Sequence, residues 1–368
     1  MNKKNVLFLD HAIEMGGAEY SLYYLIKYLD TQSINSVLMV PSKSKLATMA
    51  ESLNISVIYN DLNSPKEVLR FLRNIVSIRR FIKRNNINII YCNTYRTIIY
   101  GVFLKLISNC KIIWHVRDYY KNYYLKFIYA IFSSKIICIS KSISEQFSRL
   151  FNNKISIVYN GVDLEYYNFE KVPGNLKEEL NFTKDKILVG MVGRIDRWKG
   201  IHLLIEAAAY IVNELNKKEF VFVIVGESIL TKDQSYKMEL KEMVKKYRIE
   251  DNVLFLGQRD DIPNLMKSFD LTVNYSDNEP FGRVIIESLA MGTPVIVNNT
   301  GGAPEIIRNI GMGMITEKRD SRLLAKSILE MTKKRLDAKQ KIQYIKKVHE
   351  IYDARIPGRK VSSILKQL

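Results

Sequence analysis

ILVGMVGRIDRWKG, residues 187–200, contains a predicted strand, a glycine-bounded loop and the start of a predicted helix, in that order. Ile187–Val192 is a continuous apolar run, which is typical of a strand buried on both faces of a parallel sheet. A glycine follows this run, and a helical pattern begins near the last glycine, Gly200. The order of buried strand, loop and helix predicts an α/β domain.

The same unit recurs in both directions along the chain. Seven candidate strands precede residue 160 and six follow it, with helical stretches between them. The first seven are Val6–Asp10, Ser36–Val40, Ser56–Tyr59, Ile87–Tyr91, Lys111–Trp114, Ile136–Ile139 and Ser156–Val158. The other six are Ile187–Val192, Phe220–Val225, Val253–Leu256, Leu271–Asn274, Pro294–Val297 and Met312–Ile315. Because thirteen strands are more than a single open, twisted sheet usually contains, we predict an α/β fold with two doubly wound, Rossmann-like sheets.

A turn-forming sequence, Tyr159–Asp163, separates the two groups of strands. We therefore predict a first domain over 1–163, a second domain over 164–345 and a helical tail over 346–368. Pro357 is expected to interrupt any single long helix in this tail. Ligands of open α/β sheets bind beyond the carboxyl ends of the strands. We therefore expect both domains to face a central cleft, with the binding residues just after each strand.

Composition and charge limit the class of protein. The 368 residues suggest about two domains, and 47% hydrophobic with 26% charged residues is the balance of a folded protein. The net charge of +18 favours an acidic partner: a nucleic acid, an anionic membrane surface or a phosphorylated substrate. The three widely spaced cysteines predict small buried side chains in a reducing cytosol. No apolar run approaches the ~18 residues that span a bilayer, so we expect a cytosolic protein.

Two loops carry candidate anion-binding residues. Arg194 and Lys199 lie five positions apart after strand 187–192, and this spacing suits a diphosphate. Arg can hold a phosphate with two parallel hydrogen bonds, and Lys adds a point charge. Gly16 and Gly17 precede a predicted helix, where the backbone can approach a ligand and free N–H groups favour an anion. A solvated basic loop and an ordinary turn remain the alternatives for these two segments.

The segment SDNEPFGRVIIE, residues 276–287, follows another predicted strand. A helix cap is expected at Asp277 or Asn278. Glu279 would then lie in the loop that faces the cleft, and Glu287 would lie farther along the helix. Two carboxylates with this spacing suit the paired hydroxyl groups of a polyhydroxylated ligand.

The combination of these segments resembles glycosyltransferase family 4, whose members have the GT-B architecture. Four motifs occur in that family's order, and the resemblance spans residues 16 to 305. They are Gly-Gly-Ala-Glu at 16–19, Gly-Arg…Lys-Gly at 193–200, Glu-x7-Glu with its Pro-Phe-Gly at 279–287, and Gly-Gly-x-x-Glu at 301–305. The resemblance implies transfer of a sugar from a nucleoside-diphosphate sugar, with retention of the anomeric configuration and without a metal ion. It also implies that the first domain binds the acceptor, that the second domain binds the donor, and that the helical tail packs back on the first domain.

The resemblance also implies roles for ten residues. The group at the reacting sugar and its diphosphate comprises His115, Glu279, Arg194 and Lys199. The group that binds the rest of the donor comprises Gly16, Gly17, Gly226, Phe281, Gly282 and Glu287. Glu279 would contact hydroxyls of the transferred sugar, Glu287 would contact the ribose hydroxyls, and His115 would lie beside the donor sugar. Free N–H groups around Phe281 and Gly282 would favour an anion.

A predicted helix over Lys66–Arg84 carries a large part of the remaining positive charge. It holds seven basic residues and one acid, with the basic positions repeating at intervals of three and four. A solvated surface helix would explain its apolar stripe but not the single sign of its polar face. We therefore expect this basic helix to dock on an anionic membrane surface. Tyr119–Phe132 is a second candidate for the lipid interface, with a buried aromatic helix as the alternative.

These features predict a hexosyltransferase-type glycosyltransferase that acts on a saccharide acceptor, expected to be lipid-linked, in cell-surface polysaccharide or lipopolysaccharide biosynthesis. We expect it in the cytoplasm, on the inner face of the cell membrane. The alternatives are an inactive glycosyltransferase-like partner subunit and a synthase for a soluble acceptor. No metal or other cofactor is expected besides the donor, because no Asp-x-Asp motif follows a predicted strand. Nucleic acid is not expected as a partner, because zinc-finger spacing, RNP-like strands and basic-zipper heptads are lacking.

Overall fold

The computed structural model describes residues 3–62, 64–228, 234–334 and 336–368, and within these ranges the chain forms two compact units. Unit 1 comprises Met1–Gly161 together with Ala354–Leu368, and unit 2 comprises Val162–Asp353. The chain therefore passes between the units twice, once at each end of unit 2.

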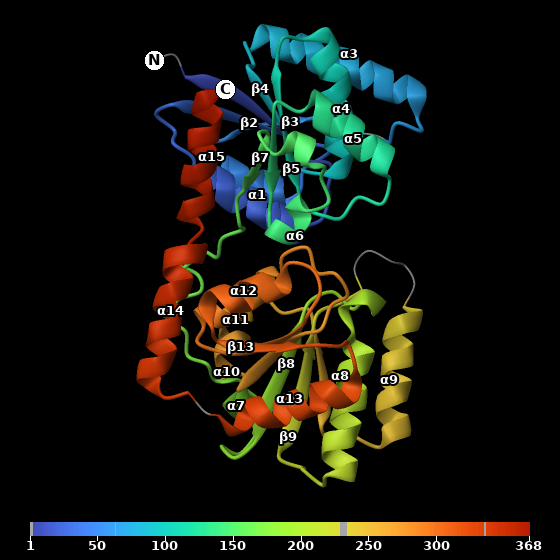
Figure 1. Cartoon of the computed structure of the whole chain (residues 1–368), viewed down its shortest axis with the longest axis vertical. Coiled ribbons are helices and arrows are strands. Elements are labelled where there is room, and N and C mark those ends of the chain that lie inside the picture. The colour runs from blue at the N-terminus through green and yellow to red at the C-terminus, as the bar shows by residue number, and fades with distance from the viewer. Residues whose placement is uncertain (1–2, 63, 229–233, 335) are drawn as a thin grey trace. The chain divides into compact units, whose positions relative to one another are not determined.

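Unit 1 is built on a seven-stranded parallel sheet with the order β3-β2-β1-β4-β5-β6-β7. Its strands are β1 Lys4–Leu9, β2 Ile34–Val40, β3 Ser56–Tyr59, β4 Ile89–Cys92, β5 Lys111–Val116, β6 Lys135–Cys138 and β7 Ile155–Ile157. Its α-helices are α1 Gly17–Lys27, α2 Lys45–Glu51, α3 Val68–Arg84, α4 Tyr95–Ile107, α5 Tyr123–Phe132, α6 Lys141–Ser144 and α15 Arg355–Gln367. Helices α1, α2 and α15 lie together over one face of this sheet, and α3, α4 and α5 cover the other (Figure 1).

The sequence explains this packing element by element. The central strand β1 is fully buried along Val6–Leu9, as expected for an apolar run in the middle of a parallel sheet. Helix α15 contributes Val361 and Leu365 to the same core as Leu25 of α1. Helix α3 is amphipathic, because four of its apolar positions share one buried face and its basic positions stay exposed. The buried positions of α3 are Phe71, Ile75, Ile78 and Ile82.

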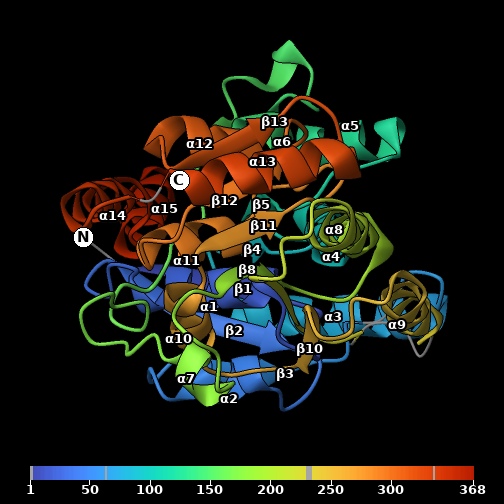
Figure 2. The same cartoon turned by 90° about the horizontal axis from the view of Figure 1, so that it is seen from below.

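Unit 2 is built on a six-stranded parallel sheet with the order β10-β9-β8-β11-β12-β13. Its strands are β8 Ile187–Val192, β9 Phe220–Val225, β10 Val253–Gly257, β11 Leu271–Asn274, β12 Val295–Asn298 and β13 Gly313–Thr316. Its α-helices are α7 Leu176–Glu179, α8 Ile201–Ala209, α9 Ser235–Tyr247, α10 Ile262–Ser268, α11 Arg283–Ala290, α12 Ala303–Ile310, α13 Ser321–Lys333 and α14 Ala338–Tyr352. Helices α8, α9 and α13 lie on one side of this sheet, and α10, α11 and α12 lie on the other (Figures 1 and 2).

The prediction of two doubly wound parallel sheets is confirmed, with seven strands in the first and six in the second. In unit 1 the strand order reverses between β1 and β4, and in unit 2 it reverses between β8 and β11. Ligands of doubly wound sheets bind beyond the carboxyl ends of the strands at such a reversal. Within the described ranges, no helix has both the length and the apolar character needed to cross a lipid bilayer.

Two local expectations are wrong. The tail was expected to begin at 346 and to pack on the first domain, but residues up to Asp353 belong to unit 2. The reason is that α14 buries Val348 and Tyr352 against unit 2, so the helix break falls before Arg355. Pro357 then lies in the first turn of α15, where its missing N–H costs nothing. The expected cap at Asp277 or Asn278 is also wrong, because α11 begins after Gly282.

Candidate functional site

In unit 2, the predicted cations lie at the point where the strand order reverses. A small cavity there is lined by residues of β8, β11 and the loops that follow them. Its polar lining consists of Arg194, Lys199, Asn274 and Ser276, together with the backbone of Gly193. The structure therefore brings the two sequence-predicted cations together beside the carboxyl ends of two neighbouring strands.

Three buried side-chain oxygens at or just after the ends of the neighbouring strands β11 and β12 lack a hydrogen-bond partner among the described residues. They are Asn274 Oδ1, Ser276 Oγ and Asn298 Oδ1. A buried polar atom that is left unpaired costs about 1–3 kcal/mol. Such atoms are rare in folded proteins, so three of them at adjacent strand ends mark a place where a polar ligand or ordered water supplies the missing hydrogen bonds.

Glu279 forms an ion pair with one of these cations. Its Oε2 atom lies 2.7 Å from Lys199 Nζ, and the two side chains are only 10% and 17% exposed. The Lys199 ammonium group also lies 4.0 Å from the centre of the Trp198 ring. The pair therefore holds a cation and a carboxylate at the cavity, where an anionic group and a hydroxyl group of one ligand could replace their mutual contact.

The loop that carries Glu279 is held by a glycine pair from the next strand-to-helix loop. The Gly302 N–H donates to the Glu279 carbonyl oxygen at 2.7 Å. Gly301 has a φ of +69°, and a Cβ atom at this position would lie 2.3 Å from the same carbonyl oxygen. Only glycine allows this close approach. The Gly-Gly-x-x-Glu element thus positions Glu279 through the backbone.

The other predicted residues of this segment, Glu287, Phe281 and Gly282, differ in how much of each remains available to a ligand. Glu287 is buried and accepts a hydrogen bond from Arg283 Nη2 at 2.8 Å. The two residues form an ion pair between positions one helical turn apart. Phe281 is 2% exposed, and its ring packs 6.0 Å from the ring of Tyr352. Its side chain is therefore a core element, and only its backbone remains for a ligand. Gly282 caps α11 with a φ of +98°, which leaves the first N–H groups of that helix without side-chain caps.

Gly226, which follows β9, lies against the backbone of Gly193, which follows β8. A Cβ atom on Gly226 would lie 1.9 Å from the Gly193 carbonyl oxygen, and its φ of +136° is also unfavourable for other residues. The Gly226 N–H donates to the Gly257 carbonyl oxygen at 2.7 Å. The close approach of Gly226 to Gly193 restricts the start of the loop that carries Arg194.

In unit 1, Gly16 and Gly17 lie at the start of α1, after the loop that follows β1. Gly16 is the N-cap residue, and its N–H donates to the Glu19 carboxylate at 2.8 Å. Asp10, the first residue after β1, is completely buried nearby. Burial and the negative charge of Glu19 raise the pKa of Asp10 from 3.8 to about 7.

A buried chain of hydrogen bonds runs from Asp10 across the carboxyl ends of β4 and β5. Asn93 Nδ2 donates to Asp10 Oδ2 at 2.6 Å, and Arg117 Nε donates to Asn93 Oδ1 at 2.7 Å. A second donor of the same guanidinium, Nη1, lies 3.0 Å from Asn160 Oδ1. These side chains are fully or almost fully buried, so the network is rigid.

His115 lies at the other end of this network, and one of its ring nitrogens is unpaired. Its Nδ1 atom lies 2.6 Å from the Tyr91 hydroxyl and 3.2 Å from Arg117 Nη2. Its Nε2 atom is buried and has no hydrogen-bond partner among the described residues. Burial and the positive charge of Arg117 hold the pKa of His115 well below its usual range, so the ring is neutral.

Two family models match the chain, and together they cover most of it. Residues 15–166 match Glycosyltransferase Family 4, and residues 174–348 match Glycosyl transferases group 1. The chain belongs to the family 4 type of GT-B glycosyltransferases. The resemblance carried by the four sequence motifs is therefore confirmed.

Relatives with known names are similar to this glycosyltransferase over different lengths. A UDP-Gal:alpha-D-GlcNAc-diphosphoundecaprenol alpha-1,3-galactosyltransferase of Escherichia coli is 28% identical, with 72% of this chain and 71% of that protein covered. An N-acetyl-alpha-D-glucosaminyl L-malate synthase of Bacillus anthracis is 30% identical, with 50% of this chain and 45% of that protein covered. Among solved structures, Anabaena HepE in complex with UDP-glucose has a TM-score of 0.83 and 25% identity, with 99% of this chain and 100% of that chain covered.

Sequence reasoning on this glycosyltransferase missed several buried polar residues. Asn274, Asn298 and Asn93 each end a strand or follow one directly, and Asp10 and Arg117 do the same. The signal that could have found them is their position, because parallel strands end at the edge of the sheet where ligands bind. The part of the chain that the structure describes contains no group of three or more His, Cys, Asp or Glu side chains that could hold a metal ion.

Proposed function

We propose that this glycosyltransferase moves a sugar from a nucleoside-diphosphate sugar to a lipid-linked saccharide, with retention of configuration, in cell-surface polysaccharide or lipopolysaccharide assembly. The observation that carries the proposal is the cavity where Arg194, the Lys199–Glu279 pair and the unpaired oxygens of Asn274 and Ser276 meet. The named relatives support it, because one acts on a diphosphoundecaprenol-linked sugar and a structural neighbour binds UDP-glucose.

The leaving group dictates what the cations do. Negative charge develops on the nucleoside diphosphate as its bond to the sugar breaks, and preorganised positive charge lowers the barrier. Arg194 would hold the diphosphate through parallel hydrogen bonds, and Lys199 would turn from Glu279 toward the same group. Glu279 would then accept hydrogen bonds from hydroxyls of the transferred sugar, and Glu287 from those of the ribose.

The neutral His115 acts as a hydrogen-bond donor in this proposal. Because Arg117 can only donate, the lone pair at His115 Nδ1 is an acceptor, and the ring proton is on Nε2. This N–H would donate to a hydroxyl group of the donor sugar. We assign no covalent nucleophile, and we propose that departure and attack occur on the same face of the sugar. Protein cations take the place of a metal ion in this reaction.

The acceptor side of the proposal rests on the basic face of α3. The exposed face of Lys66–Arg84 would attract an anionic membrane surface, where a lipid-linked acceptor is also found. We therefore propose that the protein works as a peripheral protein on the inner face of the cell membrane.

A donor screen with matched variants tests the proposal. A panel of nucleoside-diphosphate sugars is assayed for release of the nucleoside diphosphate by the wild type, Arg194→Ala, Lys199→Ala and Arg197→Ala. We expect the first two variants to lower kcat/KM about 100-fold or more, since removal of one preorganised donor has costs of that order. Arg197 lies on the same loop but pairs with Glu239 on the surface, so its variant should stay within a few-fold of the wild type.

Three outcomes would contradict parts of this proposal. Turnover of Arg194→Ala and Lys199→Ala within a few-fold of the wild type would remove the assigned donor site. No turnover of any donor by the wild type would favour an inactive partner subunit. Transfer to a small soluble acid, as in the named malate synthase, would replace the lipid-linked acceptor with a soluble one.

A further inference from the structure

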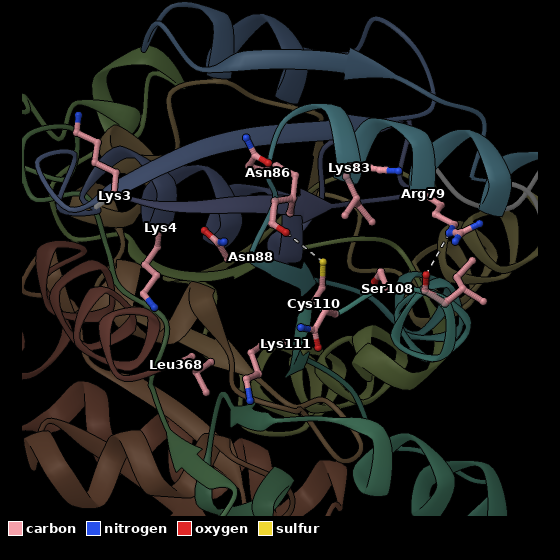
Figure 3. Close-up of a pocket in the computed structure, with 14 residues that line it drawn as sticks. Lys3, Lys4, Arg79, Lys83, Asn86, Asn88, Ser108, Cys110, Lys111 and Leu368 are labelled. Carbon is pink, nitrogen blue, oxygen red and sulfur yellow. Dashed lines mark hydrogen bonds between the residues drawn. The ribbon is translucent and has the colours of Figure 1, made fainter. Parts of the chain in front are cut away.

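Unit 1 has a hollow of its own, at the edge of its sheet where strands β1 and β5 begin. It has a volume of about 690 Å³ and is lined by the starts of β1 and β5, the last turn of α3 and the ends of α4 and α15. This volume is in the range of pockets that hold small ligands. Figure 3 shows its polar side chains, which come from segments far apart in the sequence. None of the proposed donor-site residues lines it.

Positive charge dominates this hollow. Its charged side chains are Lys3, Lys4, Arg79, Lys83 and Lys111, and no Asp or Glu side chain is part of its lining (Figure 3). None of these five cations forms an ion pair with another described residue. Five like charges around one hollow repel one another, and a bound anion would relieve this repulsion.

Helix stabilisation explains only part of this charge. Arg79 Nε donates to the Ile107 carbonyl oxygen at 3.1 Å and so caps the end of α4. Lys83 lies in the last turn of α3, where a cation is favourable. Lys3, Lys4 and Lys111 precede or begin strands, and this argument does not apply to them.

An exposed apolar strip adjoins the cationic hollow. On α4, Phe103, Leu106 and Ile107 are 43%, 62% and 41% exposed, and Ile107 also lines the hollow. On α3, Leu72 and Val76 are exposed as well. The two helices are in contact, and the rings of Phe71 and Phe103 lie 5.1 Å apart. The strip and the hollow therefore form one surface, which we call the α3–α4 end surface.

We propose that the α3–α4 end surface docks on an anionic phospholipid bilayer, with a lipid phosphate in the cationic hollow and the apolar strip in the headgroup region. The inference rests on the membrane location in the proposed function and deepens it by naming a headgroup site. A free phosphate ion would use the cations but not the apolar strip. A nucleic acid would gain nothing from exposed Leu106, whereas an interfacial surface combines both features.

Vesicle flotation with paired charge reversals tests the hollow. Phosphatidylcholine vesicles with and without phosphatidylglycerol are mixed with the wild type, Lys83→Glu/Lys111→Glu and Lys66→Glu/Arg73→Glu. The control pair reverses the same charge on the basic face of α3 but outside the hollow. We expect the first pair to lower partitioning into the anionic vesicles about tenfold or more, and the control pair to lower it less, since each cation at the lipid surface contributes roughly 1 kcal/mol.

A pair of apolar substitutions tests the strip. Leu106→Ser should weaken partitioning several-fold at high salt, where charge attraction is screened. Leu150→Ser removes a side chain of the same size that is 69% exposed elsewhere in unit 1, and it should have no effect. Circular dichroism checks that all variants are folded.

Three outcomes would overturn the inference. Equal partitioning of the two charge-reversal pairs would show that no hollow-specific contact exists. An unchanged Leu106→Ser variant would show that the strip stays in water. Tighter binding to a duplex oligonucleotide than to vesicles, lost in Lys83→Glu/Lys111→Glu, would assign the hollow to nucleic acid. Donor turnover in solution is measured separately, so failure of the proposed reaction remains distinguishable from failure of lipid docking.

Discussion

At the scale of single residues, the environment of His115 dictates what its ring can do. A guanidinium group faces Nδ1, the Tyr91 hydroxyl approaches the same atom, and the ring is buried. A proton on Nδ1 would face the positive Arg117, so the proton is on Nε2, and a second proton is strongly disfavoured. Such a ring serves as a fixed donor rather than as an acid–base group.

Removal of the Tyr91 hydroxyl tests this arrangement. Tyr91→Phe deletes one hydrogen bond that orients the ring, while Arg117 still fixes the tautomer. We expect kcat for donor turnover to fall about three- to tenfold with KM nearly unchanged, which corresponds to the loss of one hydrogen bond. ¹⁵N NMR of His115 should show protonated Nε2 and unprotonated Nδ1 in both proteins, with no titration near pH 6.5. A ring that titrates near that pH would contradict the assignment.

Asp10 makes stability depend on pH. Its pKa is about 7 in the folded protein and 3.8 ordinarily, so folding takes up a proton between these values. The stabilisation from this proton is complete at low pH and is lost as pH rises through about 7. Relative to Asp10→Asn, the wild type should lose ~1–3 kcal/mol in its free energy of unfolding between pH 5 and pH 8.

Urea unfolding followed by Trp114 fluorescence in a Trp198→Phe background measures this difference for unit 1. The chain has two tryptophans, and Trp114 is the buried one in unit 1. Parallel pH profiles for the wild type and Asp10→Asn would refute the proposed proton uptake.

At the scale of elements, the strand-end glycines of unit 2 differ in what they tolerate. Gly193 has a φ of +149° but open space where a Cβ atom would be. Gly226 has a φ of +136° and, in addition, the Gly193 carbonyl oxygen in that space. The first position is limited by backbone conformation alone, and the second by conformation and contact together.

The two alanine substitutions at these positions should therefore have different effects. Gly193→Ala should cost ~1–2 kcal/mol, the usual strain of an unfavourable backbone conformation. Gly226→Ala should cost more, because β8 and β9 must also separate at their ends. Thermal unfolding followed by circular dichroism compares them. A smaller loss of Tm in Gly226→Ala than in Gly193→Ala would contradict this account of the contact.

The elements also explain why sequence reasoning succeeded in some places and failed in others. Strands such as Val6–Leu9 were predictable because parallel strands are continuous apolar runs. The start of α11 was not, since Gly282 at positive φ and the contact of Gly301 with Glu279 decide it from outside the helix. Arg194 and Lys199 stood out as a pair of cations on one loop. Asn274 did not, because a single polar residue at a strand end forms no pattern.

At the scale of the whole chain, unit 1 is not one continuous segment. Its core includes Val361 and Leu365, which lie 200 residues or more beyond Gly161. Gly358 of α15 lies so close to α1 that a Cβ atom would be 2.5 Å from the Tyr28 carbonyl oxygen. The two crossings between the units are also joined, since the Val162 N–H donates to the Tyr352 carbonyl oxygen at 2.7 Å.

A split protein tests the dependence of unit 1 on α15. Residues 1–161 expressed alone should accumulate in insoluble form, because the apolar face of α1 is left uncovered. Co-expression with residues 162–368 should return the fragment to the soluble fraction. Co-expression with residues 162–353, which lack α15, serves as the control and should not. Soluble, cooperatively unfolding 1–161 without any partner would contradict this expectation.

The discontinuity of unit 1 also sets an order of events during synthesis on the ribosome. Residues 162–353 form a continuous segment, so unit 2 can fold as soon as its own last helix has emerged. Unit 1 begins first but must wait for Leu365 before the face of α1 is covered. The half of the protein that is translated earlier is therefore the half that is finished later, and its α1 face stays uncovered in the meantime.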